Sequence, residues 1–144
     1  MTIDGSVLEG SPSVGLYVSD ADLELVSSVI RGTKPQPNGL FGDGVGVLRR
    51  AEETTNVKVR SSRIESSARS GIANFAGNVE VLETTMECNP IDLDGERVLP
   101  PFPTRDFAFD DRGGNACGCS GEVKECVVLT ANLVAPKPLE PGPP

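Results

Sequence analysis

The stretch Val59-Arg60-Ser61-Ser62-Arg63-Ile64-Glu65 is one of four related copies in this chain of 144 residues. The other copies are Ile3-Asp4-Gly5-Ser6-Val7-Leu8-Glu9, Leu25-Val26-Ser27-Ser28-Val29-Ile30-Arg31 and, more weakly, Val81-Leu82-Glu83-Thr84-Thr85-Met86-Glu87. The copies begin at residues 3, 25, 59 and 81, so that successive steps are 22, 34 and 22 residues long. A repeat of this length is typical of a solenoid, in which each repeat packs only on its neighbours.

Each copy contains short alternations of apolar and polar residues, which predict strands. The alternating runs are Leu23-Glu24-Leu25, Val57-Lys58-Val59 and Val79-Glu80-Val81, and then, after a corner, residues 15–18, 44–47 and 71–74. Strands this short, joined by tight corners, cannot pair with each other within one copy. They can pair in parallel with the equivalent strands of the next copy. The sequence therefore predicts an all-β fold, a right-handed parallel β-helix of about four turns.

Equivalent positions of the copies should stack as ladders along the solenoid. We expect one ladder of hydroxyl groups at a corner, formed by Ser6, Ser28, Ser62 and Thr84. A second corner carries Gly15, Gly44 and Gly71, where a positive φ or the close approach of neighbouring turns favours glycine. Asn74 interrupts the apolar ladder of Val18 and Val47, and because a buried amide needs partners we expect it to mark the end of regular stacking.

The 34-residue step holds two insertions, residues 33–43 and 48–56, which flank the predicted strand 44–47. Insertions in repeat proteins cluster on one face, and that face often binds a ligand. The candidate binding residues on this face are Asn38, Phe41, Asp43, Arg49 and Arg50. The alternative is that these loops have no function, because lengthening a loop costs little stability.

The composition changes after the fourth copy. Residues 1–95 are predicted to form the β-helix, residues 96–135 a capping strap with a cysteine cluster, and residues 136–144 a proline-rich disordered tail. The strap contains Phe102, Phe107 and Phe109, which we expect to cover the open end of the stack.

The four cysteines are Cys88, Cys117, Cys119 and Cys126. Cysteines two residues apart rarely bond to each other, so one of Cys117 and Cys119 should bond to Cys126 and the other can reach Cys88. A zinc site is the alternative, but it normally shows paired Cys-x-x-Cys spacings or histidines, and the chain contains no His. Disulfides are favoured, and with them an oxidising, extracellular or cell-surface location.

Charge and hydropathy exclude several classes of partner. The net charge is −8 and the chain has no basic stripe, which disfavours nucleic acid and anionic lipid. The sequence contains no apolar run of about 18 residues, so it predicts no membrane span. No signal peptide is visible, yet Met1 and Ile3 already occupy strand positions. We therefore expect further N-terminal turns of the same protein to precede this chain.

Catalytic chemistry is restricted by the absence of His, which rules out Ser-His-Asp, Cys-His and His-zinc sites. Carboxylate pairs could catalyse glycoside hydrolysis or bind calcium, the one cofactor considered, although no motif supports either. The candidate carboxylates are Asp20 and Asp22, Asp43, Asp92 and Asp94, and Asp110 and Asp111. Each also has a simpler explanation as a turn or surface residue, so no catalytic residue and no metal ligand is assigned.

The repeats resemble right-handed parallel β-helix proteins of the pectate-lyase-like superfamily. The resemblance lies in residues 28–33, 39–45 and 62–65, and it extends over residues 1–95 and to Cys117-Gly118-Cys119. The most similar members are uncharacterised secreted or surface proteins of predatory soil bacteria. The resemblance implies the fold and an extracellular setting. Characterised members include polysaccharide lyases, glycoside hydrolases and adhesins, but the chain shows no match to the lyase and hydrolase motifs and has no His. We therefore favour a non-catalytic solenoid for carbohydrate binding, adhesion or scaffolding, with polysaccharide or the cell envelope as partner. The alternative is a C-terminal fragment of a polysaccharide lyase or glycoside hydrolase whose active site lies on missing N-terminal turns.

Overall fold

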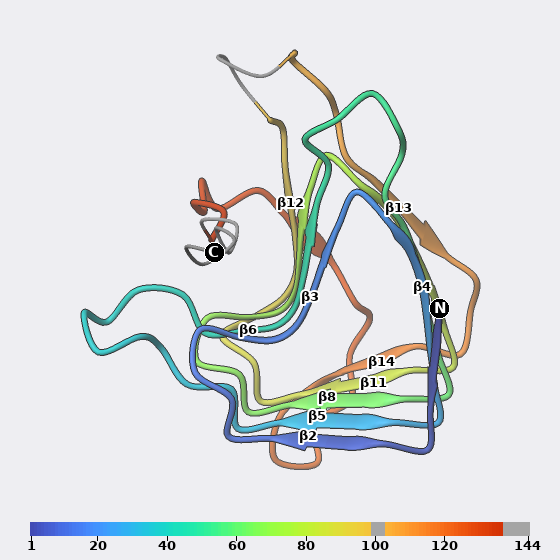
Figure 1. Cartoon of the computed structure of the whole chain (residues 1–144). Coiled ribbons are helices and arrows are strands. Elements are labelled where there is room, and N and C mark those ends of the chain that lie inside the picture. Colours follow the sequence, from blue (N-terminus) through green and yellow to red (C-terminus); the bar gives the residue numbers. More distant parts are fainter. Residues whose placement is uncertain (99–102, 137–144) are drawn as a thin grey trace.

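The structure, a computed structural model, describes residues 1–98 and 103–136. Within these residues the chain winds as a right-handed parallel β-helix with three sheets of five strands each and no helix (Figure 1). Nothing in the described residues is a helix long and apolar enough to cross a membrane. The predicted fold class is confirmed.

Each turn of the β-helix adds one strand to each sheet. The first sheet contains β1 (Thr2–Asp4), β4 (Asp22–Val26), β7 (Asn56–Arg60), β10 (Asn78–Leu82) and β13 (Ala108–Asp111). The second contains β2 (Val7–Glu9), β5 (Val29–Arg31), β8 (Arg63–Glu65), β11 (Thr85–Glu87) and β14 (Ala116–Gly118). The third contains β3 (Val14–Ser19), β6 (Asp43–Leu48), β9 (Ser70–Phe75), β12 (Ile91–Glu96) and β15 (Val128–Leu129).

The register of the strands follows the sequence repeat. In the first sheet Leu25 pairs with Val59, and Val59 pairs with Val81. In the second sheet Ile64 lies between Ile30 and Met86, and all three side chains are fully buried. The core is therefore a column of stacked aliphatic side chains, one layer per turn, as expected for a chain with no Trp and a single Tyr.

The hydroxyl ladder satisfies the backbone where the chain turns from the first sheet to the second. The backbone N–H of Ser6 donates to Ser28 Oγ at 3.1 Å, and that of Ser28 donates to Ser62 Oγ at 3.1 Å. The Ser28 and Ser62 hydroxyls donate in turn to carbonyl oxygens two residues earlier. In the last turn Asn115 replaces the hydroxyl and accepts from Thr84 N–H at 3.0 Å.

The glycine ladder results from close approach of neighbouring turns. Gly15, Gly44 and Gly71 all have negative or extended φ, so no left-handed conformation is involved. A Cβ on any of them would lie 2.7 or 2.8 Å from a carbonyl oxygen of the next turn. Only glycine therefore fits at this corner.

Stacking continues past Asn74, contrary to the expectation that this residue marks its end. The Asn74 side chain is fully buried, and its Nδ2 donates to the carbonyl oxygens of Gly77 and Ala108, both at 3.0 Å. Its Oδ1 accepts from Gly77 N–H at 2.8 Å. The next residue in this ladder is Gly95, whose missing side chain makes room for the ring of Phe107. Stacking can continue because the Asn74 amide has hydrogen-bond partners and the Phe107 ring fills the space beside Gly95.

The stack also extends beyond residue 95, where the sequence repeat ends. Segment 96–135 contributes β13, β14 and β15, which pair in parallel with the fourth turn. Phe109 pairs with Val79 in this layer, and its ring meets that of Phe107 edge-on with centroids 6.2 Å apart. Of the three predicted capping rings, Phe102 lies outside the described residues, as does the tail beyond Pro136.

Two disulfides attach this fifth layer. They join Cys88 to Cys119 and Cys117 to Cys126, so that no thiolate is left for the alternative zinc site. Cys88 follows β11 and Cys119 follows β14, and these strands are paired neighbours. Cys88 and Cys119 therefore occupy equivalent corners of adjacent turns. Of the two cysteines in the Cys117-Gly118-Cys119 segment, it is Cys119 that bonds to Cys88. Two disulfides are consistent with an oxidising environment.

Candidate functional site

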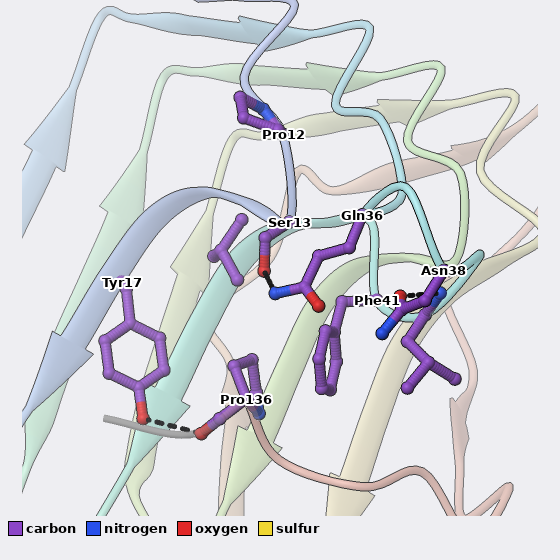
Figure 2. Close-up of a pocket in the computed structure, with 9 residues that line it drawn as sticks. Pro12, Ser13, Tyr17, Gln36, Asn38, Phe41 and Pro136 are labelled. Atoms are coloured by element: carbon purple, nitrogen blue, oxygen red, sulfur yellow. Dashed lines mark hydrogen bonds between the residues drawn. The ribbon is translucent and has the colours of Figure 1, made fainter. Parts of the chain in front are cut away.

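A cavity of about 560 Å³ lies on the outer face of the third sheet, beside the first insertion (Figure 2). Its floor comes from β3 and the corner before it and one wall from the insertion, while Pro136, from the C-terminal segment, residues 130–136, lies at its edge. The lining residues are Pro12, Ser13, Val14, Tyr17, Gln36, Asn38, Leu40, Phe41 and Pro136. Concave, mostly apolar sites of about 300–1,000 Å³ with a few polar groups are typical ligand pockets.

The insertion is ordered by its own turn and by the corner beneath it. Gly39 N–H donates to Gln36 O and Gln36 N–H donates to Leu40 O, both at 2.8 Å, while Asn38 Oδ1 accepts from Leu40 N–H at 3.0 Å. Gly39 has a φ of +81°, which fits the Pro-Asn-Gly sequence of this turn. At the base of the loop, Ser13 N–H donates to Lys34 O at 2.8 Å. The wall of the cavity is therefore preformed.

Polar groups of the cavity are partly engaged with each other. Gln36 Nε2 donates to Ser13 Oγ at 3.3 Å, and the Tyr17 hydroxyl donates to Pro136 O at 3.5 Å (Figure 2). Burial raises the pKa of the Tyr17 phenol; the nearby Arg50 opposes this shift and Asp20 adds to it. Tyr17 therefore stays protonated and acts as a hydrogen-bond donor at neutral pH.

An ion pair lies behind the insertion. The fully buried Asp43 carboxylate accepts from Arg69 Nε at 2.8 Å, from Arg69 Nη2 at 2.5 Å and from the Ser70 hydroxyl at 2.7 Å. The Arg69 guanidinium carbon lies 5.2 Å from the centre of the Phe41 ring, a cation–π distance. Arg69 Nη1 donates to Val134 O at 3.1 Å. This guanidinium thus joins the insertion, β6 and the C-terminal segment.

The C-terminal segment packs on the outer face of the third sheet. Leu133 and Ala135 pack on a cluster formed by Leu48, Ala73 and Phe75. The segment is also held by hydrogen bonds, because Thr130 Oγ1 donates to Gly95 O at 2.8 Å and Ala131 N–H donates to Asp94 Oδ1 at 2.9 Å. These residues, 130–136, are the C-terminal strap, and they place Pro136 at the edge of the cavity.

Two of the five predicted binding residues, Asn38 and Phe41, line the cavity, and Asp43 lies behind it. Arg49 and Arg50 do not join them, because they begin the second insertion at the other end of β6. Arg50 binds Asp20 through its backbone N–H at 2.8 Å and its Nε at 3.3 Å. Burial raises the pKa of Asp20, but the hydrogen bonds from Arg50 and Ala51 outweigh this effect and lower it. These groups order the second insertion.

The other candidate carboxylates lie apart from the cavity and bind neighbouring groups. Asp22 Oδ1 accepts from Asn56 Nδ2 at 2.8 Å, and Asp110 pairs with Arg112 at 2.9 Å. Asp111 accepts from Gly113 N–H and Asp92 from Asn89 Nδ2, at 2.8 and 3.3 Å. The described residues contain no group of three or more acidic, Cys or His side chains that could hold a metal ion.

Seven of the nine lining residues were not identified from the sequence, and neither was Arg69; four of these eight carry polar groups. Ser13, Tyr17 and Gln36 line the cavity, and Arg69 lies behind it. Tyr17 is the only Tyr in the chain and occupies an outward position of a predicted strand, a signal that could have marked it. Arg69 lies 26 residues after its partner Asp43, and no local pattern connects them.

No family model matches the chain, and neither a curated protein nor a solved structure does. Membership of the pectate-lyase-like superfamily therefore stays a prediction.

Proposed function

We propose that this protein is a non-catalytic, extracellular carbohydrate-binding β-helix, and that the cavity beside the first insertion holds the sugar. The observation that carries the proposal is the combination of two aromatic rings, Tyr17 and Phe41, with the amides of Gln36 and Asn38 in one cavity. Sugars present apolar C–H faces and a rim of hydroxyl groups. A site for them needs flat apolar surfaces and side chains that both donate and accept hydrogen bonds.

The aromatic rings supply the flat surfaces. Phe41 is a half-buried ring at the base of the insertion, and Tyr17 stands on the outer side of β3. Aromatic side chains contribute large contact areas with few rotatable bonds, so little entropy is lost when a ligand packs on them. The Arg69 guanidinium carbon lies over the Phe41 ring, 5.2 Å from its centre.

The amides and hydroxyls supply the polar contacts. Asn38 uses its oxygen to accept from Leu40 N–H within the turn, which leaves its NH₂ group to face a ligand. Gln36 and Ser13 bond to each other at 3.3 Å, a long contact that sugar hydroxyls can replace. Because the surrounding turn is preformed, binding does not require the loop to be ordered first, and this favours affinity.

The two disulfides support an extracellular setting, since such bonds persist in oxidising compartments. A polysaccharide of the cell envelope or of the surroundings is the partner that fits such a protein. Secretion or display at the cell surface belongs to the same proposal.

The test is a glycan array, followed by calorimetry on each glycan that binds. Phe41→Ala should weaken binding about tenfold, which corresponds to ~1.4 kcal/mol, the scale of one aromatic contact. Val123→Ala is the matched control, because Val123 is 77% exposed and belongs to the loop between Cys119 and Cys126. Absence of any glycan that binds, or equal affinity of wild type and Phe41→Ala, would contradict the proposal.

A further inference from the structure

We infer that the cavity selects a neutral glycan over a uronate, and that Asp43 sets this preference by cancelling the charge of Arg69. The inference rests on the proposed function, because it names the class of sugar that the same cavity takes. It depends on three features of the site: an uncharged lining, a guanidinium whose three nitrogens each donate a hydrogen bond, and a buried carboxylate that pairs with it.

The lining is uncharged in a chain that carries 13 basic and 21 acidic residues. Among the described residues that line the cavity, none is Lys, Arg, Asp or Glu. Their polar groups are amides, hydroxyls and backbone atoms, which match sugar hydroxyls. A carboxylate moved from water into such a cavity would lose hydration without meeting a counter-charge, and that loss is costly.

Arg69 is the cation placed to change this balance, because its guanidinium lies directly behind Phe41. Each of its three nitrogens already has an acceptor: Nε and Nη2 donate to Asp43, and Nη1 donates to Val134 O. The Arg69 side chain is 18% exposed and that of Asp43 is not exposed at all. The bidentate pair therefore presents no net charge to the cavity.

The rest of the molecule disfavours anions further. A net charge of −8 repels an acidic polysaccharide at long range, and this repulsion is weakened by salt. The affinity for a neutral glycan should in contrast be nearly independent of salt concentration. The two ligand classes are therefore distinguishable in the wild-type protein alone.

Removal of the Asp43 charge should reverse the preference. In Asp43→Asn the amide oxygen can still accept from Arg69 Nε or Ser70, but the guanidinium loses the carboxylate that it binds directly. A unit charge within about 10 Å of the ligand, partly screened, should raise the affinity for uronates about three- to tenfold. The affinity for neutral glycans should stay within about twofold of the wild-type value.

Glu24→Gln is the matched control for this variant. Glu24 pairs with Arg60 at 2.5 Å on the first sheet, so the substitution changes the net charge equally and frees an arginine elsewhere. An equal gain in uronate affinity in both variants would show an effect of net charge and would overturn the role of Asp43. If Asp43→Asn does not fold, the double variant Asp43→Asn/Arg69→Gln removes both charges and should keep the neutral preference.

The experiment measures binding of matched pairs of oligosaccharides that differ only in charge, such as oligogalacturonides and their methyl esters, beside an array of neutral and acidic glycans. Tighter binding of neutral members, unaffected by salt, is the expected result. Tighter binding of acidic members would overturn the inference and leave the proposed function intact. Binding of no glycan would overturn the proposed function, and the inference with it.

Discussion

The carboxyl groups of Asp94 and Glu96 lie on the same outer side of β12, beneath the C-terminal strap, and each keeps one buried oxygen without a hydrogen-bond donor. Their side chains are only 0% and 6% exposed. Two buried carboxylates on the same side of one strand would repel each other and lose hydration, so protonation of one of them is favoured.

This pair should make the protein less stable as the pH rises. Burial raises the pKa of Asp94 above its ordinary 3.8; Ala131 N–H and Arg69 oppose the shift, and Asp43 adds to it. Burial and the charge of Asp94 raise the pKa of Glu96 above 4.5, against hydrogen bonds from the strap. An acid with a raised folded pKa contributes stability that is present below its unfolded pKa and lost as the pH rises through its folded pKa.

Glu96→Gln should flatten this dependence, because the amide carries no charge to repel Asp94 and can donate a hydrogen bond to the unpartnered Asp94 Oδ2. We expect the variant to gain about 1 kcal/mol relative to wild type at pH 7 and little at pH 4. Thermal melting from pH 4 to pH 8 measures the difference. Glu125→Gln, at an exposed position, is the control. A constant difference between wild type and Glu96→Gln across this range would show that the titration of Glu96 does not affect stability.

Ile64→Asp should abolish cooperative folding. Ile64 is fully buried between Ile30 and Met86, and an unpaired carboxylate there costs more than a small aliphatic core can offset. Val7→Asp is the control in the same sheet, since Val7 is 57% exposed, and it should change stability by less than about 0.5 kcal/mol. Circular dichroism during urea unfolding distinguishes the two; a cooperative transition for Ile64→Asp would contradict the packing.

Asn74→Leu should destabilise the protein by about 2–4 kcal/mol. The substitution leaves Gly77 N–H and the carbonyl oxygens of Gly77 and Ala108 buried without their partner. Asn78→Ala is the control, because Asn78 is exposed and only pairs with Asn56. The free energies of unfolding in urea give the comparison. Similar values for both variants would mean that the Asn74 network contributes nothing.

Reduction of the disulfides should loosen the fifth turn without melting the first three. Each layer of a solenoid contacts only its neighbours, so the loss of Cys88–Cys119 and Cys117–Cys126 acts locally. Hydrogen exchange should speed up in β14 and in residues 119–126, while β5 and β8 stay protected. Uniform exchange throughout the chain after reduction would contradict this local action. Mass spectrometry of non-reduced peptides checks the pairing itself.

The candidate site could be predicted only in part. Asn38 and Phe41 were found because they lie in an insertion that breaks a 22-residue period, which is visible without any structure. Arg49 and Arg50 were grouped with them because both insertions flank one strand. Strand β6 separates Arg49 and Arg50 from the cavity, because the first insertion precedes this strand and the second follows it.

Alternation along the strands and the spacing of the copies were enough to predict the β-helix, its register and its ladders over the first four turns. Both are local properties, and stacking repeats them in the next turn. The fifth turn, the pairing of Arg69 with Asp43 and the contact of Tyr17 with Pro136, 119 residues away in the chain, became visible only in the structure. These contacts join segments that share no repeat, and they depend on how irregular segments fill the end and the outer face of the stack.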